Sequence, residues 1–191
     1  MYLFFDTETT GLPKHYNAPV EHLENWPRLV QIAWLLFDGS QHCTSEKNYM
    51  IKPDGFTIPE SAIKIHGITT EKALSEGSDL SPVLKEFSED ITHALLVVGH
   101  NIHFDEKIVA AEFLRKKINH SLFDKTRICT MQSSTQYCKI PSKYGNYKWP
   151  NLKELHRKLF HEEFDGAHNA YSDVNACAKC FFELKKRGVI K

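Results

Sequence analysis

Apolar residues recur with two different periods along the chain, and together they predict a mixed α/β protein. Residues 29–37 are almost continuously apolar, as in a central strand, and residues 42–51 alternate more and can pair with them as a hairpin. The apolar start predicts a first strand over residues 1–6, and residues 95–98 predict a short buried strand that ends at a glycine. Helical patterns separate these strands, which favours a sheet covered by helices.

Helices are predicted where apolar residues recur three and four positions apart, or where capping signals stand. The clearest apolar stripe covers residues 80–92, and Asn151 forms a capping pair with Glu154. In chain order, we predict helices from Pro59 to His66, from Thr70, over residues 80–92, around Phe104 to Leu114, from Asn151 through Leu159, and from about Asn169 to Lys186. Residues 13–27, rich in Pro, Asn and His, are predicted to form a surface loop.

Chain length and charge balance limit the number of domains and the kinds of binding partner. The 191 residues, 41% of them apolar, suit a single domain over residues 1–191. Lys plus Arg equals Asp plus Glu at 24 each, so a polyanionic partner has to be held by a local patch. No apolar run approaches the roughly 20 residues of a membrane span, and the start does not fit a signal peptide, so we expect a cytoplasmic protein without membrane contact.

The cysteines favour a reducing compartment over a disulfide framework, because the five are scattered and odd in number. Cys177 and Cys180 have the spacing of a zinc or redox pair. They lie within a helical pattern, however, and no second closely spaced Cys or His pair completes four ligands. We therefore interpret both thiols as small core residues.

Asp6 and Glu8 stand one residue apart at the end of the first apolar run. Side chains two positions apart on a strand point to the same face, about 6.6 to 7 Å apart along it. Ionised carboxylates beside a buried strand cost free energy unless a cation meets them, so the pair indicates a metal site. A polar strand end before a Thr-rich turn is the alternative for the pair taken alone.

Asp105 and Asp173 are placed to join this pair. Asp105 follows the strand predicted at residues 95–98 and lies in the first turn of the next helix, and Asp173 lies at the start of the last helix on its core side. Taken singly, each fits a helix-start acid stabilised by backbone amides. Taken with the first pair, they are ends of elements that one sheet can bring together.

Four segments resemble, in chain order, the motifs of the DnaQ-like, or DEDDh, 3′-to-5′ exonuclease superfamily: FFDTETTGL, KIHGITTE, VGHNIHFDEKIV and HNAYSDV. The resemblance spans Tyr2 to about Val174. The family includes the epsilon subunit of bacterial DNA polymerase III, ribonuclease T and oligoribonuclease. It implies a ribonuclease H-like α/β fold, with a mixed five-stranded sheet flanked by helices on both faces, and one exonuclease domain over residues 1–191.

The resemblance also implies a two-metal phosphodiesterase. Two Mg²⁺ or Mn²⁺ ions would be held by Asp6, Glu8, Asp105 and Asp173, and such hard cations prefer oxygen ligands. In the family pattern Asp6 bridges both ions, Glu8 and Asp173 complete the site of the nucleophilic water, and Asp105 serves the leaving-group ion through water.

His168 is the candidate general base, because an imidazole titrates near neutral pH. It stands five residues before Asp173, and positions five apart on a helix are rotated by about 140°, so it has to lie on the preceding loop to reach the same site. A structural role is the alternative for a histidine taken alone. A tyrosine variant of the superfamily has Tyr at the position of Asn169, so the histidine class is indicated.

Substrate contacts rest on the resemblance, which gives Thr9, Leu12, Ile65, His66 and Phe104. Leu12 would wedge against the terminal bases, and the last three would wall the 3′-terminal nucleotide. Core packing is the alternative for Ile65 and Phe104, and a helix-ending role is the alternative for His66. Asn101 is expected to support the backbone around Asp105.

One loop interleaves basic and aromatic residues: Lys139, Lys143, Tyr144, Tyr147, Lys148 and Trp149. Such a composition binds backbone phosphates and stacks on unpaired bases. A solvated loop without a ligand is the alternative.

We therefore expect a metal-dependent 3′-to-5′ exonuclease that acts on single-stranded or frayed DNA ends, releases nucleoside 5′-monophosphates and serves proofreading or repair, with a DNA polymerase as candidate partner. An exoribonuclease similar to ribonuclease T or oligoribonuclease is the runner-up. A catalytically silent nucleic-acid-binding module is the alternative outside enzymes. The sequence leaves open DNA against RNA preference, the native metal, the oligomeric state, and whether the chain works alone or as a polymerase subunit.

Overall fold

A mixed five-stranded sheet forms the centre of the computed structural model, which describes residues 1–191. Its strands are β1 (Tyr2–Thr9), β2 (Leu29–Phe37), β3 (Cys43–Met50), β4 (Leu96–Gly99) and β5 (Thr126–Cys129). The spatial order is β3-β2-β1-β4-β5, in which β2 runs antiparallel to both β1 and β3, while β4 and β5 run parallel to β1. The predicted fold class is confirmed.

Helices account for most of the remaining chain. They are α1 (Glu60–His66), α2 (Thr70–Glu76), α3 (Leu80–His93), α4 (Ile102–Lys116), α5 (Thr130–Ser133), α6 (Thr135–Cys138), α7 (Leu152–Phe160) and α8 (Ala170–Lys186), with 3₁₀ turns at Leu23–Asn25 and Leu122–Asp124. The predicted capping box at Asn151 and Glu154 is present at the start of α7. None of the helices combines the length and the apolar character that crossing a bilayer requires.

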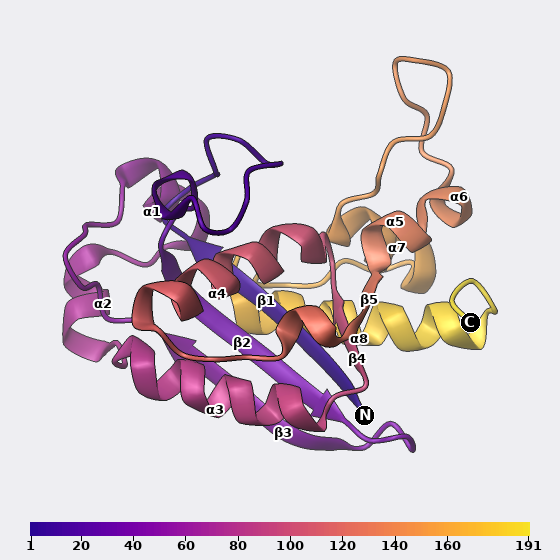
Figure 1. Ribbon diagram of the computed structural model, residues 1–191. Coiled ribbons are helices and arrows are strands. Elements are labelled where there is room, and N and C mark those ends of the chain that lie inside the picture. The colour runs from indigo at the N-terminus through magenta and orange to yellow at the C-terminus, as the bar shows by residue number, and fades with distance from the viewer.

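Alternation along β1 assigns its side chains to two packed layers. Leu3 and Phe5 join a core that includes residues of α3 and α4, whereas Phe4 joins a second core with residues of α8. The helices accordingly lie on both faces of the sheet, with α3 and α4 in front and α8 behind (Figure 1). The second core contains Cys177 and Cys180, which are 3% and 0% exposed, so their interpretation as core residues is confirmed.

The first strand is longer than the sequence pattern predicts. β1 continues to Thr9, three residues beyond the prediction, because residues 6–9 keep pairing with β2 up to a bulge between Glu8 and Thr9. Glu8, which the prediction placed after the strand, therefore lies within it together with Asp6. The short helices α5 and α6 were not predicted, and Leu95, predicted as buried strand, is 74% exposed just before β4.

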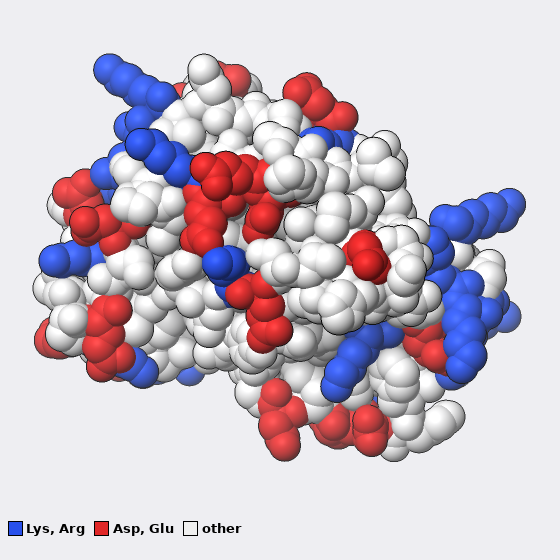
Figure 2. Space-filling view, turned by 90° about the horizontal axis from the view of Figure 1, so that it is seen from below, with Lys and Arg blue, Asp and Glu red and all other residues white.

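Charged side chains of both signs are interspersed on the face seen in Figure 2, with Lys and Arg on both sides of the view and a group of Asp and Glu between them. This arrangement agrees with equal numbers of acidic and basic residues. Neither positive nor negative charge covers that whole face, so a charged ligand has to be attracted there by local clusters of charged side chains.

Candidate functional site

The first two acids share the face of β1 that α8 covers. Asp6 pairs in register with Ala33 and Glu8 with Gln31, and Ala33 belongs to the core that packs on α8. Both acids are half-buried. The extended backbone thus directs two carboxylates toward the start of α8.

The start of α8 brings the third acid to them. The Asn169 side chain caps this helix by accepting from the backbone N–H groups of Tyr171 and Ser172 at 3.1 and 3.4 Å. Asp173 then falls in the first helical turn. One carboxylate oxygen each from Asp6, Glu8 and Asp173 lies within 4.8 Å of the others, so the structure brings these three predicted residues together.

Asp105 lies beside this trio rather than within it. Pairing of β4 with β1 ends at Phe4, which leaves the backbone of the following residues of β1 without a strand neighbour on that edge. Asp105 Oδ1 accepts hydrogen bonds there from the Thr7 backbone N–H at 3.1 Å and from Thr7 Oγ1 at 2.6 Å. The side chain of the buried Asp105 therefore substitutes for the missing strand at the open edge of β1.

Crowding and burial shift the pKa of every acid upward. Burial raises the pKa of Asp6 well above its usual range, and the charges of Asp105, Asp173 and Glu8 add to this. Burial with the charge of Asp173 raises the pKa of Glu8 to about 8. Burial raises the pKa of Asp105 to about 7, although its Thr7 hydrogen bonds oppose the shift. Burial also raises the pKa of Asp173, which a hydrogen bond from His168 opposes. Ionising all four groups together therefore costs free energy, which a positive charge placed among them would offset.

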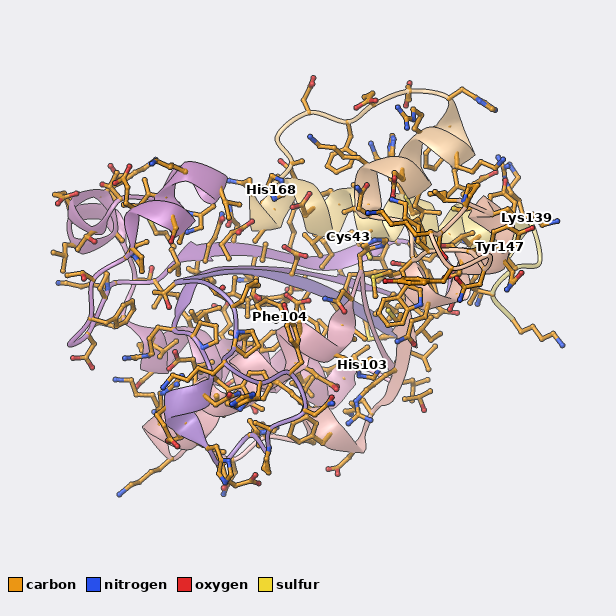
Figure 3. The ribbon with its side chains drawn as sticks, turned by 90° about the horizontal axis from the view of Figure 1, so that it is seen from above. Cys43, His103, Phe104, Lys139, Tyr147 and His168 are labelled. Carbon is orange, nitrogen blue, oxygen red and sulfur yellow. The ribbon has the colours of Figure 1, made fainter.

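His168 lies on the loop that precedes α8, as predicted. Its backbone has a left-handed φ of 69°, and its N–H donates to Asp173 Oδ2 at 2.9 Å. The residue is exposed. Figure 3 shows His168 on one side of the strands and Phe104 on the other.

The predicted substrate residues divide by exposure. Leu12 is 73% and Ile65 59% exposed, so core packing is wrong for Ile65. Phe104 is half-buried against the core of α3 and α4. Thr9 is buried, and its hydroxyl donates to the Gly11 carbonyl at 2.7 Å, which shapes the turn before Leu12.

His66 ends α1 and also keeps an unused polar atom. Its Nδ1 accepts from the Ile68 backbone N–H at 3.1 Å, while its Nε2 is buried and has no hydrogen-bond partner. Burial lowers the pKa of His66, with an opposing effect of the Thr9 backbone. The helix-ending role is therefore present.

Asn101 supports the start of α4 through its backbone. It takes the left-handed conformation, with φ of 74° and ψ of 38°, which Asn tolerates better than most residues. Its carbonyl accepts from the Phe104 N–H at 2.9 Å. The turn that carries Phe104 and Asp105 is fixed in this way.

Sequence reasoning missed Gln31, a buried polar residue within the apolar strand β2. Its Oε1 accepts from the Ala170 backbone N–H at 3.2 Å, and its Nε2 donates to Asn48 Oδ1 at 2.9 Å. The available signal was the single polar residue inside the apolar run 29–37. A buried amide in such a run needs partners, which here are the start of α8 and strand β3.

The basic and aromatic loop projects from the rest of the fold as an irregular hairpin (Figure 1). A bridge between Pro141 and Tyr147 closes it, and Tyr144 is 91% exposed. Lys148 forms an ion pair with Glu154 at 2.6 Å, so part of the predicted positive charge is neutralised within the chain.

Comparison with known proteins gives a consistent set of relatives. The family model RNase_T, described as exonuclease, matches residues 3–181. DNA polymerase III PolC-type of Latilactobacillus sakei subsp. sakei is 25% identical over 192 residues, covering 97% of this chain and 11% of that protein. E. coli Exonuclease I in complex with a dT13 oligonucleotide superimposes with a TM-score of 0.76 at 22% identity, covering 97% of this chain and 41% of that one. A zinc-bound form of the E. coli Exonuclease I complex with single-stranded DNA gives a TM-score of 0.73 at 23% identity, covering 97% of this chain and 40% of that one. The chain therefore spans only a part of these relatives.

Proposed function

The chain belongs to the RNase_T exonuclease family and is a DnaQ-like 3′-to-5′ exonuclease by descent, and from that premise we propose its substrate, cofactor and catalytic residues. It removes nucleotides from the 3′ end of single-stranded or frayed DNA in a metal-dependent reaction and releases nucleoside 5′-monophosphates. Residues 1–191 act as one exonuclease domain of the DEDDh type.

The observation that carries this proposal is the group formed by Asp6, Glu8 and Asp173, whose carboxylate oxygens lie within 4.8 Å of one another. Oxygen ligands of this kind suit Mg²⁺ and Mn²⁺. The raised pKa values of Asp6 and Glu8 express the cost of ionising these groups where they stand, and a cation offsets that cost. The residues therefore fit a divalent-metal site.

Each acid has a proposed role. Asp6, Glu8 and Asp173 would hold the metal, with Glu8 and Asp173 on the side of the attacking water, and Asp105 would act on the leaving-group side. When bound, the two ions stabilise charge on the attacking and leaving oxygens of an in-line displacement at the phosphodiester.

His168 accepts the proton of the attacking water at its imidazole. Its backbone bond to Asp173 Oδ2 holds the residue beside the carboxylates that face the water. Because His168 is exposed, the accepted proton can pass to solvent before the next cycle.

Exposed apolar residues support the proposed contacts with the 3′-terminal nucleotide of the substrate. Leu12, which follows the acid-bearing strand β1, and Ile65 on α1 remain open to solvent, and an exposed aliphatic side chain can pack against a terminal base. His66 Nε2 and Phe104 are proposed as further contacts of the terminal nucleotide, with Thr9 shaping the turn that presents Leu12.

DNA is proposed as the substrate because E. coli Exonuclease I, the structural relative, was crystallised with dT13 and dA16 oligonucleotides. The similarity to a polymerase of the PolC type supports a DNA polymerase as partner. RNA is tested as the competing substrate in parallel.

The test follows 5′-labelled single strands of DNA and RNA incubated with the protein in Mg²⁺, in Mn²⁺ and in chelator. We expect a ladder that shortens from the 3′ end of DNA in either metal, none in chelator, and loss of at least about 10³-fold in rate for Asp6→Asn or His168→Ala. Asp124→Asn, which changes an exposed acid on Leu122–Asp124, is the control and keeps the wild-type rate. A ladder that survives Asp6→Asn, or the absence of any ladder in either metal, contradicts the proposal. Faster shortening of RNA than of DNA shows that the protein is an exoribonuclease instead.

A further inference from the structure

A pocket of about 590 Å³ opens beside the start of α4. Four aromatic side chains line it: Tyr16, Trp26, Phe104 and Trp149. Its size falls within the range of about 300–1,000 Å³ that is usual for small-molecule sites. None of the residues that line it belongs to the proposed metal site.

The wall of this pocket is built by contacts within the chain. Lys107 of α4 donates to the Ala18 carbonyl at 3.2 Å and the Tyr16 carbonyl at 3.4 Å, and its ammonium lies 5.1 Å from the centre of the Trp26 ring. Trp26 is 4% exposed, and its Nε1 donates to the Pro19 carbonyl at 3.0 Å. The loop that carries Tyr16 is therefore held against α4 by hydrogen bonds, and the buried Trp26 ring forms a fixed part of the pocket wall.

Two of the four aromatic rings remain exposed. Tyr16 is 55% and Trp149 60% exposed, although each lies at the pocket and has buried neighbours. Tyr16 comes from the loop before β2, and Trp149 comes from the end of the projecting hairpin; both segments rise on the same side of the molecule in Figure 1. Exposed rings gathered at a concave site indicate a ligand with a flat surface.

Polar groups at the same pocket suit the edges of such a ligand. Asn17, Asn101 and Gln132 are among the residues that line it, and each has a side-chain amide with both a donor and an acceptor. Nucleobases combine a stacking face with donor and acceptor edges, so the lining matches unpaired bases.

The pocket lies next to one of the four acids, which indicates which part of the substrate strand it can bind. Phe104 lines the pocket and directly precedes Asp105, whose carboxylate is bonded to Thr7 on the acid-bearing strand. We propose that this pocket binds unpaired bases of the substrate strand that lie more than one nucleotide to the 5′ side of the nucleotide being removed, with Tyr16 and Trp149 as stacking surfaces. The inference rests on the proposed exonuclease function and adds a binding site for the part of the strand that is not cleaved in that cycle.

The test compares substrates that do and do not reach the pocket. Values of kcat/KM are measured for a thymidine dinucleotide and for dT6 with wild type, Tyr16→Ala and Trp149→Ala. We expect each variant to lower kcat/KM for dT6 by about 5- to 150-fold, the effect of losing one stacked base, and to lower it less for the dinucleotide. Tyr16→Phe and Trp149→Phe keep a ring and retain most of the rate on dT6. Equal losses on both substrates, or no loss on dT6, overturn the inference.

A binding measurement separates this inference from the proposed function. The affinity for 5′-fluorescein-labelled dT10 is measured by anisotropy in chelator, where hydrolysis is absent. Weaker binding by Tyr16→Ala and Trp149→Ala, with unchanged binding by the exposed control Leu95→Ala, supports the pocket even if wild type cleaves nothing. Wild-type affinity in both aromatic variants overturns the pocket even if wild type cleaves DNA.

Discussion

Gln31 and Ala170 join the second strand of the sheet to the start of the last helix, because Gln31 Oε1 accepts the Ala170 N–H at 3.2 Å. Gln31 lies opposite Glu8 in the register of β1 and β2, and Ala170 stands three residues before Asp173. The bond therefore fixes the start of α8, which carries Asp173, against β2, the strand that pairs with the acid-bearing β1. It acts on the acids only through their backbones, which makes Gln31 a positioning residue.

Replacing this amide tests that role. Gln31→Leu leaves the Ala170 N–H unsatisfied, which costs about 1–3 kcal/mol, and it allows the start of α8 to shift. We expect the Mg²⁺ concentration for half-maximal rate to rise and the maximal rate to fall about 10-fold or more. Thermal unfolding measured alongside gives the loss in stability.

The control for Gln31→Leu is Gln136→Leu, which changes an exposed glutamine on α6 in the same way. It is expected to leave the Mg²⁺ dependence unchanged. If Gln31→Leu lowers stability while the Mg²⁺ dependence stays that of wild type, Gln31 has a structural role only.

The sequence predicted the elements better than the links between them. Periodicity located β2 and α3, and capping signals located α7, because these depend on neighbouring residues. The end of β1 was missed because Thr9 is held by cross-strand pairing with Leu29, which a local pattern does not contain. The same holds for the bonds Gln31–Ala170 and Thr7–Asp105, which join residues 139 and 98 positions apart.

Thr7→Val tests the hydrogen bond that holds Asp105. The Thr7 hydroxyl favours the ionised carboxylate, so its removal raises the pKa of Asp105 further above its usual range. We expect the acid limb of the kcat/KM profile against pH, measured in Mg²⁺, to move to higher pH. Thr126→Val, at an exposed position of β5, is expected to keep the wild-type profile. If the acid limb of Thr7→Val is not shifted, ionisation of Asp105 does not control the pH dependence of kcat/KM.

Stability without a divalent cation should fall as pH rises. The folded-state pKa values of Glu8 and Asp105, about 8 and about 7, lie above those of the unfolded chain, so the native state binds more protons between these limits. The unfolding free energy in chelator therefore decreases from about pH 4.5 to pH 8. Differential scanning calorimetry is expected to give a Tm several degrees lower at pH 8 than at pH 5.5, at about 2–4 °C per kcal/mol.

Two comparisons identify the acids as the cause of this pH dependence. Saturating Mg²⁺ raises the Tm more at pH 8 than at pH 5.5, since the ion binds ionised ligands in the native state. Glu8→Gln in chelator flattens the dependence because one titrating group is removed. A Tm in chelator that rises from pH 5.5 to pH 8 is incompatible with the raised pKa values.

Gly166 controls the loop that carries His168. Its φ is +77°, and a Cβ placed there would meet Ser172 Oγ at 2.7 Å. Gly166→Ala therefore adds a steric clash with the first turn of α8 to the cost of about 1–2 kcal/mol for a left-handed alanine. Because His168 and Asp173 are bonded across this loop, we expect the rate to fall about 10- to 100-fold with a modest loss in Tm.

Gly188→Ala isolates the contribution of the clash. Gly188 has a similar φ of +70° and no atom within 4 Å of an added Cβ, and it lies after α8, away from His168. The two variants thus share the backbone cost and differ in the contact with Ser172. Single-turnover rates on 5′-labelled DNA at saturating Mg²⁺ are expected to drop only for Gly166→Ala. Equal rates in the two variants show that displacement of this loop does not limit the proton transfer proposed for His168.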